Sequence, residues 1–351
     1  MPAQASTATL NDSFGAVRVG TNPNTAVTFF DRNRSTGYAE QFNLGIQRQL
    51  PGTMVMEASV IGNLSRKLPM SNLSIDQIAP QVLTLQTATQ AYRPFAQFSN
   101  VSIQSPTIGM SNYYAGLIRI EKRYSYGLNF GANYTWSKLL GNLNDVGSAL
   151  GAENGPYSNY YNRRADYGPQ SNDIRHRVVL NTVYELPFGP GKRWLANNIA
   201  GQVVGGWVLG VLGAVQTGPP VTAVTQTNSC NCFSAGSQRP NVIGDPNLES
   251  SQRSIARWFN TSVFSQPATL TFGNEGLGII RAPGIVNFDF SLARTFRVTE
   301  RFHAELRGEF FNALNHTNFG LPGTTYGSST FGVVSSSGPA RQIEVGAKFS
   351  F

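Results

Sequence analysis

Residues 342–351, QIEVGAKFSF, decide the fold of this chain. Apolar side chains stand at every second position, and polar or small residues stand between them. In a β-strand, successive side chains point to opposite faces. The stretch therefore predicts a strand that is apolar on one face and polar on the other, as in strands that cross an outer membrane with lipid on one side and a polar lumen on the other. Its apolar positions are Ile343, Val345, Ala347, Phe349 and Phe351.

The same alternation recurs upstream in segments of about ten residues. It is clear in residues 302–310, 288–296, 128–136 and 114–120, and in two further pairs, 42–46 with 54–60 and 178–186 with 207–215. A helical pattern competes only in residues 75–91. The sequence predicts an all-β fold, namely an antiparallel transmembrane β-barrel that is partial, with about nine strands of a larger barrel and long extracellular loops.

The connections between the predicted strands alternate in length. Short turns near Pro51, Ser125, Pro187 and Arg297 alternate with long segments at 63–112, 141–175, 218–286 and 312–339. Outer-membrane barrels have short periplasmic turns and longer extracellular loops. We therefore expect all four long segments on the extracellular side, and the final strand to end in the periplasm at Phe351.

Composition narrows the class of protein. Only 13% of the 351 residues are charged, against roughly a quarter in soluble domains. No apolar run approaches the roughly 18–20 residues of a membrane-spanning helix, so a helical membrane protein is excluded. The net charge of +8 is spread along the chain without a basic stripe, so we expect no nucleic-acid partner. Residues 1–10 do not resemble a secretory signal, so either the protein stays inside the cell or its true N-terminus is missing.

Aromatic residues collect near the ends of the predicted strands. We interpret them as the girdles that mark both membrane interfaces, although ordinary β-propensity would also place aromatic residues in strands. They are Tyr113, Tyr114, Tyr124, Tyr126, Trp136, Tyr184, Trp194 and Trp207.

Two residue types that often carry chemistry are scarce. Cys230 and Cys232 allow either a local disulfide in an oxidising compartment or two idle thiols. His176, His303 and His316 lie on different segments without a carboxylate or cysteine at ligand spacing. We therefore expect no metal site, no cofactor, no catalytic residues and no enzymatic activity.

Several motifs resemble a known family. They are EKRYSYGL at 121–128, YTWSK at 134–138, YELPFG at 184–189, QTGPP at 216–220, WFN at 258–260 and FFNALNHTNF at 310–319. In this order, they resemble the C-terminal barrel of the Oar-like TonB-dependent receptors of soil Acidobacteria and their relatives. The resemblance covers residues 38–351, and residues 1–37 are interpreted as an extracellular loop or a truncated upstream strand.

The resemblance implies a location in the Gram-negative cell outer membrane, with membrane lipid and the barrel-assembly machinery as partners. Family members typically carry a signal peptide, a regulatory-like β-domain and a plug ahead of the barrel, and none of these is found in this sequence. Contact with the TonB complex is therefore expected only through N-terminal regions that are missing here. We interpret the chain as a natural truncation or a fragment of a longer protein.

Three sets of candidate functional residues follow. The apolar positions of 342–351 resemble the signal by which the assembly machinery recognises outer-membrane proteins. The charged residues Arg119, Glu121, Glu305, Arg307, Glu309 and Lys348 are expected to face the lumen, either along a substrate path or only paired with one another. Trp258, Phe259 and Phe264 are the candidate contacts of an extracellular ligand, and the alternative is a packed loop that excludes solvent.

Three functions remain open from the sequence. The first is an incomplete outer-membrane TonB-dependent receptor or transporter, which would take up a bulky solute in its full-length form. The second is an outer-membrane anchor or adhesion protein without transport activity. The third is a soluble β-sandwich or carbohydrate-binding module, in which the apolar faces would be buried between two sheets.

Overall fold

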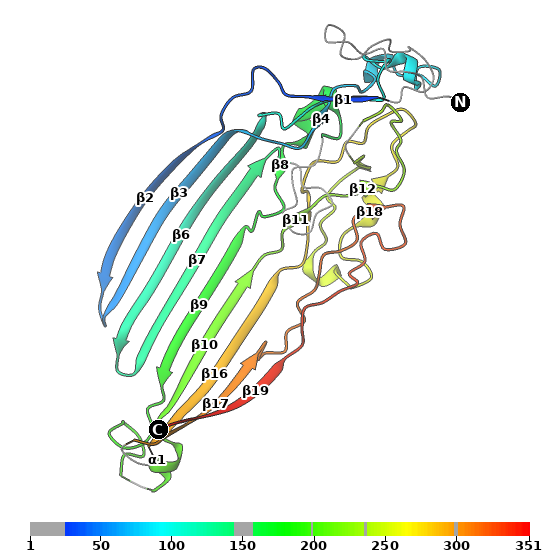
Figure 1. The fold of residues 1–351 in the computed structure, drawn as a ribbon. Coiled ribbons are helices and arrows are strands. Elements are labelled where there is room, and N and C mark those ends of the chain that lie inside the picture. The colour runs from blue at the N-terminus through cyan, green and yellow to red at the C-terminus, as the bar shows by residue number, and fades with distance from the viewer. Residues whose placement is uncertain (1–24, 144–156, 198, 235–236, 298–300) are drawn as a thin grey trace.

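Nine long strands form one sheet in which every neighbouring pair is antiparallel and follows chain order (Figure 1). The computed structural model describes residues 25–143, 157–197, 199–234, 237–297 and 301–351. The predicted antiparallel sheet of about nine strands is confirmed for this part of the chain. The strands are β2 (Tyr38–Leu50), β3 (Met54–Leu68), β6 (Gly109–Ser125), β7 (Leu128–Gly141), β9 (His176–Glu185), β10 (Trp207–Gln216), β16 (Ile285–Arg297), β17 (His303–Phe311) and β19 (Gln342–Ser350).

The strand register gathers the apolar positions onto one side of the sheet, here called the apolar face. Residues paired directly across an antiparallel ladder share a face. One such row crosses seven strands through Ile46, Ala58, Ile118, Tyr134, Val178, Val215 and Val286. A second such row joins Phe130, Thr182, Val211, Phe290, Phe310 and Ile343.

Charged residues on the apolar face are confined to the strand ends. Within the nine described strands, each of them lies within three residues of a strand terminus. A long charged side chain near the end of a membrane-spanning strand can extend its charged group to the polar interface, whereas one at the centre cannot. These residues are Glu40, Arg48, Arg66, Lys122, Lys138 and Arg294.

Connections of different length separate the two ends of the sheet (Figure 1). At one end, here called the turn end, residues 51–53 join β2 to β3, and Tyr126-Gly127 joins β6 to β7. Tyr126 and Gly127 both have positive φ, 52° and 80°, as the tight two-residue turns of β-hairpins require. At the other end, the loop end, lie the described parts of the four long connections 69–108, 142–175, 217–284 and 312–341.

Three local predictions are wrong. The expected short turn at Pro187 is a connection of residues 186–206 that contains helix α1 (Ile199–Val204), because the proline ends β9 and Gly189 redirects the chain with a φ of 101°. The short helix that the pattern of residues 75–91 allowed does not form, and the segment contains only the 3₁₀ turns η1 (Pro80–Val82) and η2 (Gln90–Tyr92), with Ile78 buried against Cys230 and Cys232. The first long connection is 69–108 instead of 63–112, because β3 and β6 continue pairing past a bulge.

Short strands organise the loop end. β1 (Ala26–Phe29), β5 (Asn100–Ile103) and β4 (Leu73–Ser74) form a three-stranded sheet, and residues 1–24 of the predicted segment 1–37 lie outside the described residues. β11 (Pro220–Val221) pairs with β15 (Ile280–Arg281), β12 (Val224–Thr225) with β18 (Thr325–Tyr326), and β13 (Asn241–Val242) with β14 (Phe264–Ser265). β8 (Gly168–Pro169) pairs antiparallel with the end of β7. 3₁₀ turns occur at η3 (Tyr160–Asp166), η4 (Ser250–Gln252) and η5 (Thr261–Val263).

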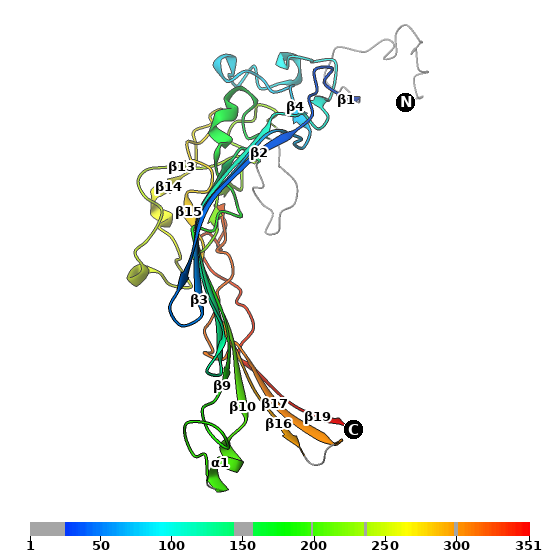
Figure 2. The ribbon, with the colours of Figure 1, turned by 90° about the vertical axis from the view of Figure 1, so that its left-hand side faces the viewer.

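The sheet is an open, curved layer (Figure 2). β2 and β19 form its two edges and do not pair with each other. Because nine antiparallel strands alternate in direction, both edge strands run from the loop end to the turn end. None of the described helices is long and apolar enough to cross a membrane.

We expect a charge at the centre of the apolar face to destabilise the protein in its membrane. Leu180 lies there between Ala132 and Gly213, and Leu180→Arg should lower stability by about 2–4 kcal/mol, the cost of arginine on the lipid face at mid-bilayer. Urea unfolding of the protein in lipid vesicles measures this loss. Asn181→Arg places the same charge one residue along, on the opposite face, and should cost far less. Equal losses in the two variants would contradict the assignment of faces.

Candidate functional site

The four long connections pack together into one body, here called the loop assembly, which comprises the described parts of residues 69–108, 142–175, 217–284 and 312–341. Its hydrophobic clusters each join two connections. Met70 and Leu73 pack with Tyr157, and Ile78 packs with Cys230 and Cys232. The largest cluster joins the third connection to the fourth and contains Ala223, Phe259, Phe264 and Ile280, with Tyr326 and Phe331 against it.

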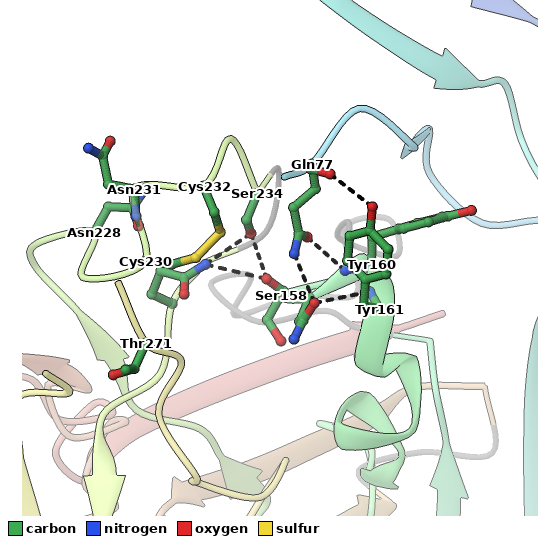
Figure 3. Close-up of a disulfide and its surroundings, with 12 residues drawn as sticks. Gln77, Ser158, Tyr160, Tyr161, Asn228, Cys230, Asn231, Cys232, Ser234 and Thr271 are labelled. Carbon is green, nitrogen blue, oxygen red and sulfur yellow. Dashed lines mark hydrogen bonds between the residues drawn. A yellow bond between two sulfur atoms is a disulfide. The ribbon is translucent and has the colours of Figure 1, made fainter. Parts of the chain in front are cut away.

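Polar contacts tie the first three connections at one place (Figure 3). The Gln77 side chain donates to Asn159 Oδ1 at 2.9 Å and accepts from the Tyr160 backbone N–H at 2.8 Å. On the other side, the Ser158 carbonyl accepts from the Ser234 hydroxyl at 2.5 Å and from Gln238 Nε2 at 3.3 Å. The second connection is thus held between the first and the third.

The two cysteines form a disulfide at this junction (Figure 3). Both side chains are fully buried, and the Ile78 backbone N–H donates to the Cys232 carbonyl at 3.0 Å. Of the two possibilities that the sequence left open, the structure has the disulfide. A disulfide is stable in an oxidising environment such as the cell surface.

Three ion pairs, each with a buried carboxylate, also lie in the loop assembly. Arg93 contacts Asp76 at 3.0 Å within the first connection. Arg239 contacts Asp166 at 2.8 Å, and Arg281 contacts Asp173 at 2.7 Å, and both pairs join the second connection to the third. Burial raises the pKa of Asp166, although Arg239 and Ser158 act in the opposite direction. Removing one partner of such a pair leaves an uncompensated buried charge, so these contacts specify one arrangement of the connections.

Glu275 is a buried carboxyl group in the third connection. Its Oε1 atom accepts from the Ala223 backbone N–H at 2.8 Å, whereas Oε2 has no hydrogen-bond partner among the described residues. Burial raises the pKa of Glu275 to about 8, against the smaller opposing effects of that hydrogen bond and of Arg239. The group is therefore largely protonated at neutral pH.

The three predicted ligand contacts lie in or beside the largest cluster. Phe259 and Phe264 are buried, and their rings meet edge to face with centroids 5.8 Å apart. Trp258 is partly buried, and its Nε1 donates to the Arg281 carbonyl at 2.9 Å. This is the arrangement expected of a packed loop, so a ligand could reach the two phenylalanine rings only if the cluster opened. Ligand contact by this segment stays a prediction.

The six predicted lumen residues share the face of the sheet opposite the apolar face, here called the polar face, but they form two separate groups. Arg119 forms an ion pair with Glu121 on β6. Arg307 on β17 contacts Glu305 at 3.1 Å and Glu309 at 3.4 Å, and Lys348 on β19 stands opposite Glu305. Strands β7, β9, β10 and β16 lie between the groups. Exposed pairs of this kind contribute roughly 0–1 kcal/mol, so the pairing neutralises charge more than it stabilises the sheet.

The predicted assembly signal lies on the edge strand β19. Its four apolar positions within the strand pair across to Phe310, Gly308, Leu306 and Ala304 of β17, and all belong to the apolar face. Phe351 follows the strand and is fully exposed at the turn end. The residues are thus accessible, and their recognition by assembly machinery stays a prediction.

The buried charges of the loop assembly are the functional candidates that the sequence did not indicate. Arg281 and Asp173 are separated by 108 residues, and Arg239 and Ser158 by 81. No local spacing signals such a pair, because partners that meet by tertiary packing have no fixed separation along the chain. Within the described residues, no group of three histidine, cysteine or acidic side chains is arranged to hold a metal ion.

A one-layer antiparallel sheet, apolar across one face and polar across the other, with long connections at one end, defines an outer-membrane β-barrel protein. The sequence matches the family model described as an outer membrane beta barrel domain over residues 2–344. The chain belongs to this family and is located in the outer membrane, where lipid contacts its apolar face.

Several solved structures are similar to this chain at low sequence identity. The outer membrane transporter YddB from Escherichia coli is 11% identical with a TM-score of 0.48, and the match covers 93% of this chain and 34% of that chain. The siderophore receptor PiuA from Acinetobacter baumannii is 10% identical with a TM-score of 0.42, covering 89% and 28%. The FrpB iron transporter from Neisseria meningitidis is 11% identical with a TM-score of 0.43, covering 93% and 33%. The chain thus spans about a third of these proteins. A search of curated proteins finds no match.

We expect the loop assembly to lose stability as the pH rises, because of Glu275. A carboxyl group whose pKa is raised from 4.5 to about 8 contributes stability that is fully present below pH 4.5 and is lost as the pH rises toward and through 8. Between pH 5 and pH 9, the loss should be on the order of a few kcal/mol. Hydrogen exchange of residues 217–284, corrected for the intrinsic effect of pH, measures it. Glu275→Gln should remove most of this dependence, and an unchanged dependence in that variant would contradict the assignment.

Proposed function

We propose that this chain is the C-terminal part of the barrel of a TonB-dependent outer-membrane receptor or transporter, which takes up a bulky solute in its full-length form. The observation that carries the proposal is the combination of a polar, charge-paired sheet face with a loop assembly at one end of the same sheet. Such a face can line a wide aqueous or plugged interior, and such loops can cover its external entrance.

The open sheet supports the part of this proposal that concerns a larger barrel. Unpaired backbone groups at the edges of β2 and β19 are costly in hydrocarbon, at several kcal/mol for each group. The two edge strands run in the same direction, so they cannot close the sheet by antiparallel pairing. Bacterial single-chain barrels have an even number of strands. We infer that further strands complete the barrel and that a plug and a TonB-contacting segment belong to the same longer protein.

The motifs that resemble Oar-like receptors support the assignment to that family of TonB-dependent receptors. They lie where a strand ends, where side chains are buried or where the backbone turns. Residues 216–220 end β10 and begin the third connection, and residues 258–260 contribute to its buried cluster. Residues 310–319 leave β17, where Asn312 has a positive φ and both its side-chain groups are hydrogen-bonded. Shared demands on packing and turns explain why these short motifs would recur in order among relatives.

One observation favours the second candidate, an outer-membrane anchor or adhesion protein. The loop assembly exposes large apolar side chains at its surface, including Leu85 at 74%, Ile243 at 77% and Val82 at 59%. Exposed apolar residues at a cell surface are suited to contacts with another macromolecule. In this candidate, the sheet would only hold the loop assembly in the membrane.

Deletion of the gene distinguishes the two candidates. We expect cells that lack the protein to leave a bulky solute unconsumed in the growth medium, as measured by mass spectrometry of the spent medium. A protonophore added to wild-type cells should reproduce the effect, because uptake draws energy from the inner membrane. Unchanged spent medium together with reduced cell aggregation would instead support the anchor, and complementation with the intact gene is the control.

The C-terminal residues are proposed to direct assembly of the barrel. Deletion of Phe351, or Phe349→Asn, should reduce the amount of heat-modifiable protein in the outer membrane severalfold while leaving synthesis unchanged. Lys348→Asn alters the same strand on its polar face and is the matched control. The proposal would be rejected if all three variants assembled as the wild type does, as measured by gel mobility with and without heating.

A further inference from the structure

A groove lies on the apolar face of the sheet, near the edge formed by β2. Its volume is about 400 Å³, and it crosses strands β2, β3, β6 and β7. Its lining includes two small residues, Ala58 and Gly116. A Cβ atom added at Gly116 would come no closer than 4.0 Å to another side chain, so the space above this glycine is open. The walls are formed by larger residues, including Leu44, Ile46, Tyr134 and Trp136.

One aromatic side chain of the groove wall, Tyr134, is held in position by His176. The Tyr134 hydroxyl and His176 Nδ1 are hydrogen-bonded at 2.8 Å, and the two rings are stacked with their centroids 6.2 Å apart. Trp136 follows on the same face of β7, with 59% of its surface exposed. Because the Tyr134 ring is already held in place, this part of the wall adds little to the entropic cost of binding.

Positive charge stands next to the groove on its loop-end side. Lys138 is the next residue after Trp136 on this face of β7, opposite Tyr114. Within the described residues, it forms no ion pair with an acidic side chain. Glu40 is on the same face but three strands away on β2, about 14 Å at the spacing of neighbouring strands. Lys138 is therefore available to an anionic group placed above the groove.

A second cation lies further toward the loop end. Arg66 Nη1 donates to Asn112 Oδ1 at 2.6 Å, and Asn112 Nδ2 donates to the Tyr167 hydroxyl at 2.8 Å. Asn112 and Tyr114 are neighbours on the apolar face of β6, and Tyr114 lies opposite Lys138. The guanidinium of Arg66, which is bonded to Asn112, is therefore held next to Tyr114, the cross-strand partner of Lys138. Cationic and polar groups thus lie on the loop-end side of an apolar groove. This order, polar groups and then apolar surface, matches the headgroup and the chains of a membrane lipid.

We propose that the groove binds one acyl chain of an anionic membrane lipid in the leaflet at the loop end, with the lipid phosphate bound by Lys138. The occupant follows from location and charge. The apolar face of an outer-membrane barrel contacts lipid, so hydrocarbon chains are the groups present at the groove. The cation at its end selects a lipid that carries net negative charge over a zwitterionic one. The proposal rests on the outer-membrane location and does not depend on transport activity.

Quenching of Trp136 fluorescence tests the proposal. The purified protein is reconstituted in phosphatidylcholine vesicles that contain a minor fraction of a lipid with brominated chains, either phosphatidylglycerol or phosphatidylcholine. Subtracting the signal of the Trp136→Phe variant isolates the quenching of Trp136. We expect brominated phosphatidylglycerol to be enriched at Trp136 by about fivefold over brominated phosphatidylcholine, the factor that one lysine beside an anionic headgroup contributes.

Variants separate the site from general lipid contact. Lys138→Gln should abolish the excess quenching by phosphatidylglycerol and retain the quenching that both lipids share. Gly116→Leu should fill the groove and also abolish the excess. Lys122→Gln removes a cation from the same face at the turn end and should leave the excess intact. Equal quenching of wild-type Trp136 by the two brominated lipids would overturn the proposal, as would no quenching by either, which would show that protein covers this face.

Discussion

Backbone hydrogen bonding between neighbouring strands is the constraint on which the rest of this structure depends. In hydrocarbon, each backbone N–H and C=O must find a partner within the protein, so the strands can cross only as a continuous ladder. The ladder also sets the register, and a slip of one residue would turn every side chain of a strand to the other face. Because the register holds from β2 to β19, rows such as that through Ala58, Ile118 and Tyr134 form one apolar face. Everything at the loop end is positioned by this sheet.

The loop assembly follows a different principle from the sheet. Its four connections have little regular structure, and they are held by buried charges, a disulfide and aromatic clusters that each join separate parts of the chain. The pairs Asp166–Arg239 and Asp173–Arg281 lock the second connection to the third, while Phe331 fixes the fourth against Phe259. Such contacts make one defined surface out of long connections. A defined surface is what either recognition of a solute or adhesion would need, and the buried Glu275 makes its stability depend on pH.

The two faces of the sheet divide the functional possibilities. On the polar face, Arg119 and Arg307 are paired with neighbouring carboxylates, so these charges of a possible solute path already compensate one another. On the apolar face, Lys138 stands without an acidic partner among the described residues, directly beyond Trp136. A cation left unpaired at the edge of hydrocarbon points to the membrane itself as its partner, because anionic headgroups are the charges found at that level.

Much of the architecture was determined by the sequence alone. Period-two alternation, as in Ile343 to Phe349, predicted the strands, their faces and the alternation of short and long connections, because these features depend on residues close together in the chain. The same local reasoning failed at Pro187, where a helix-containing connection replaces a short turn, and at residues 75–91, where 3₁₀ turns replace the short helix that the pattern allowed. Only the tertiary structure decided which buried charges meet, that Cys230 and Cys232 are bonded and fully buried, that Phe259 and Phe264 form a core, and that a groove forms beside Lys138. These features depend on packing between segments far apart in sequence, and no pattern of neighbouring residues encodes the distance between them.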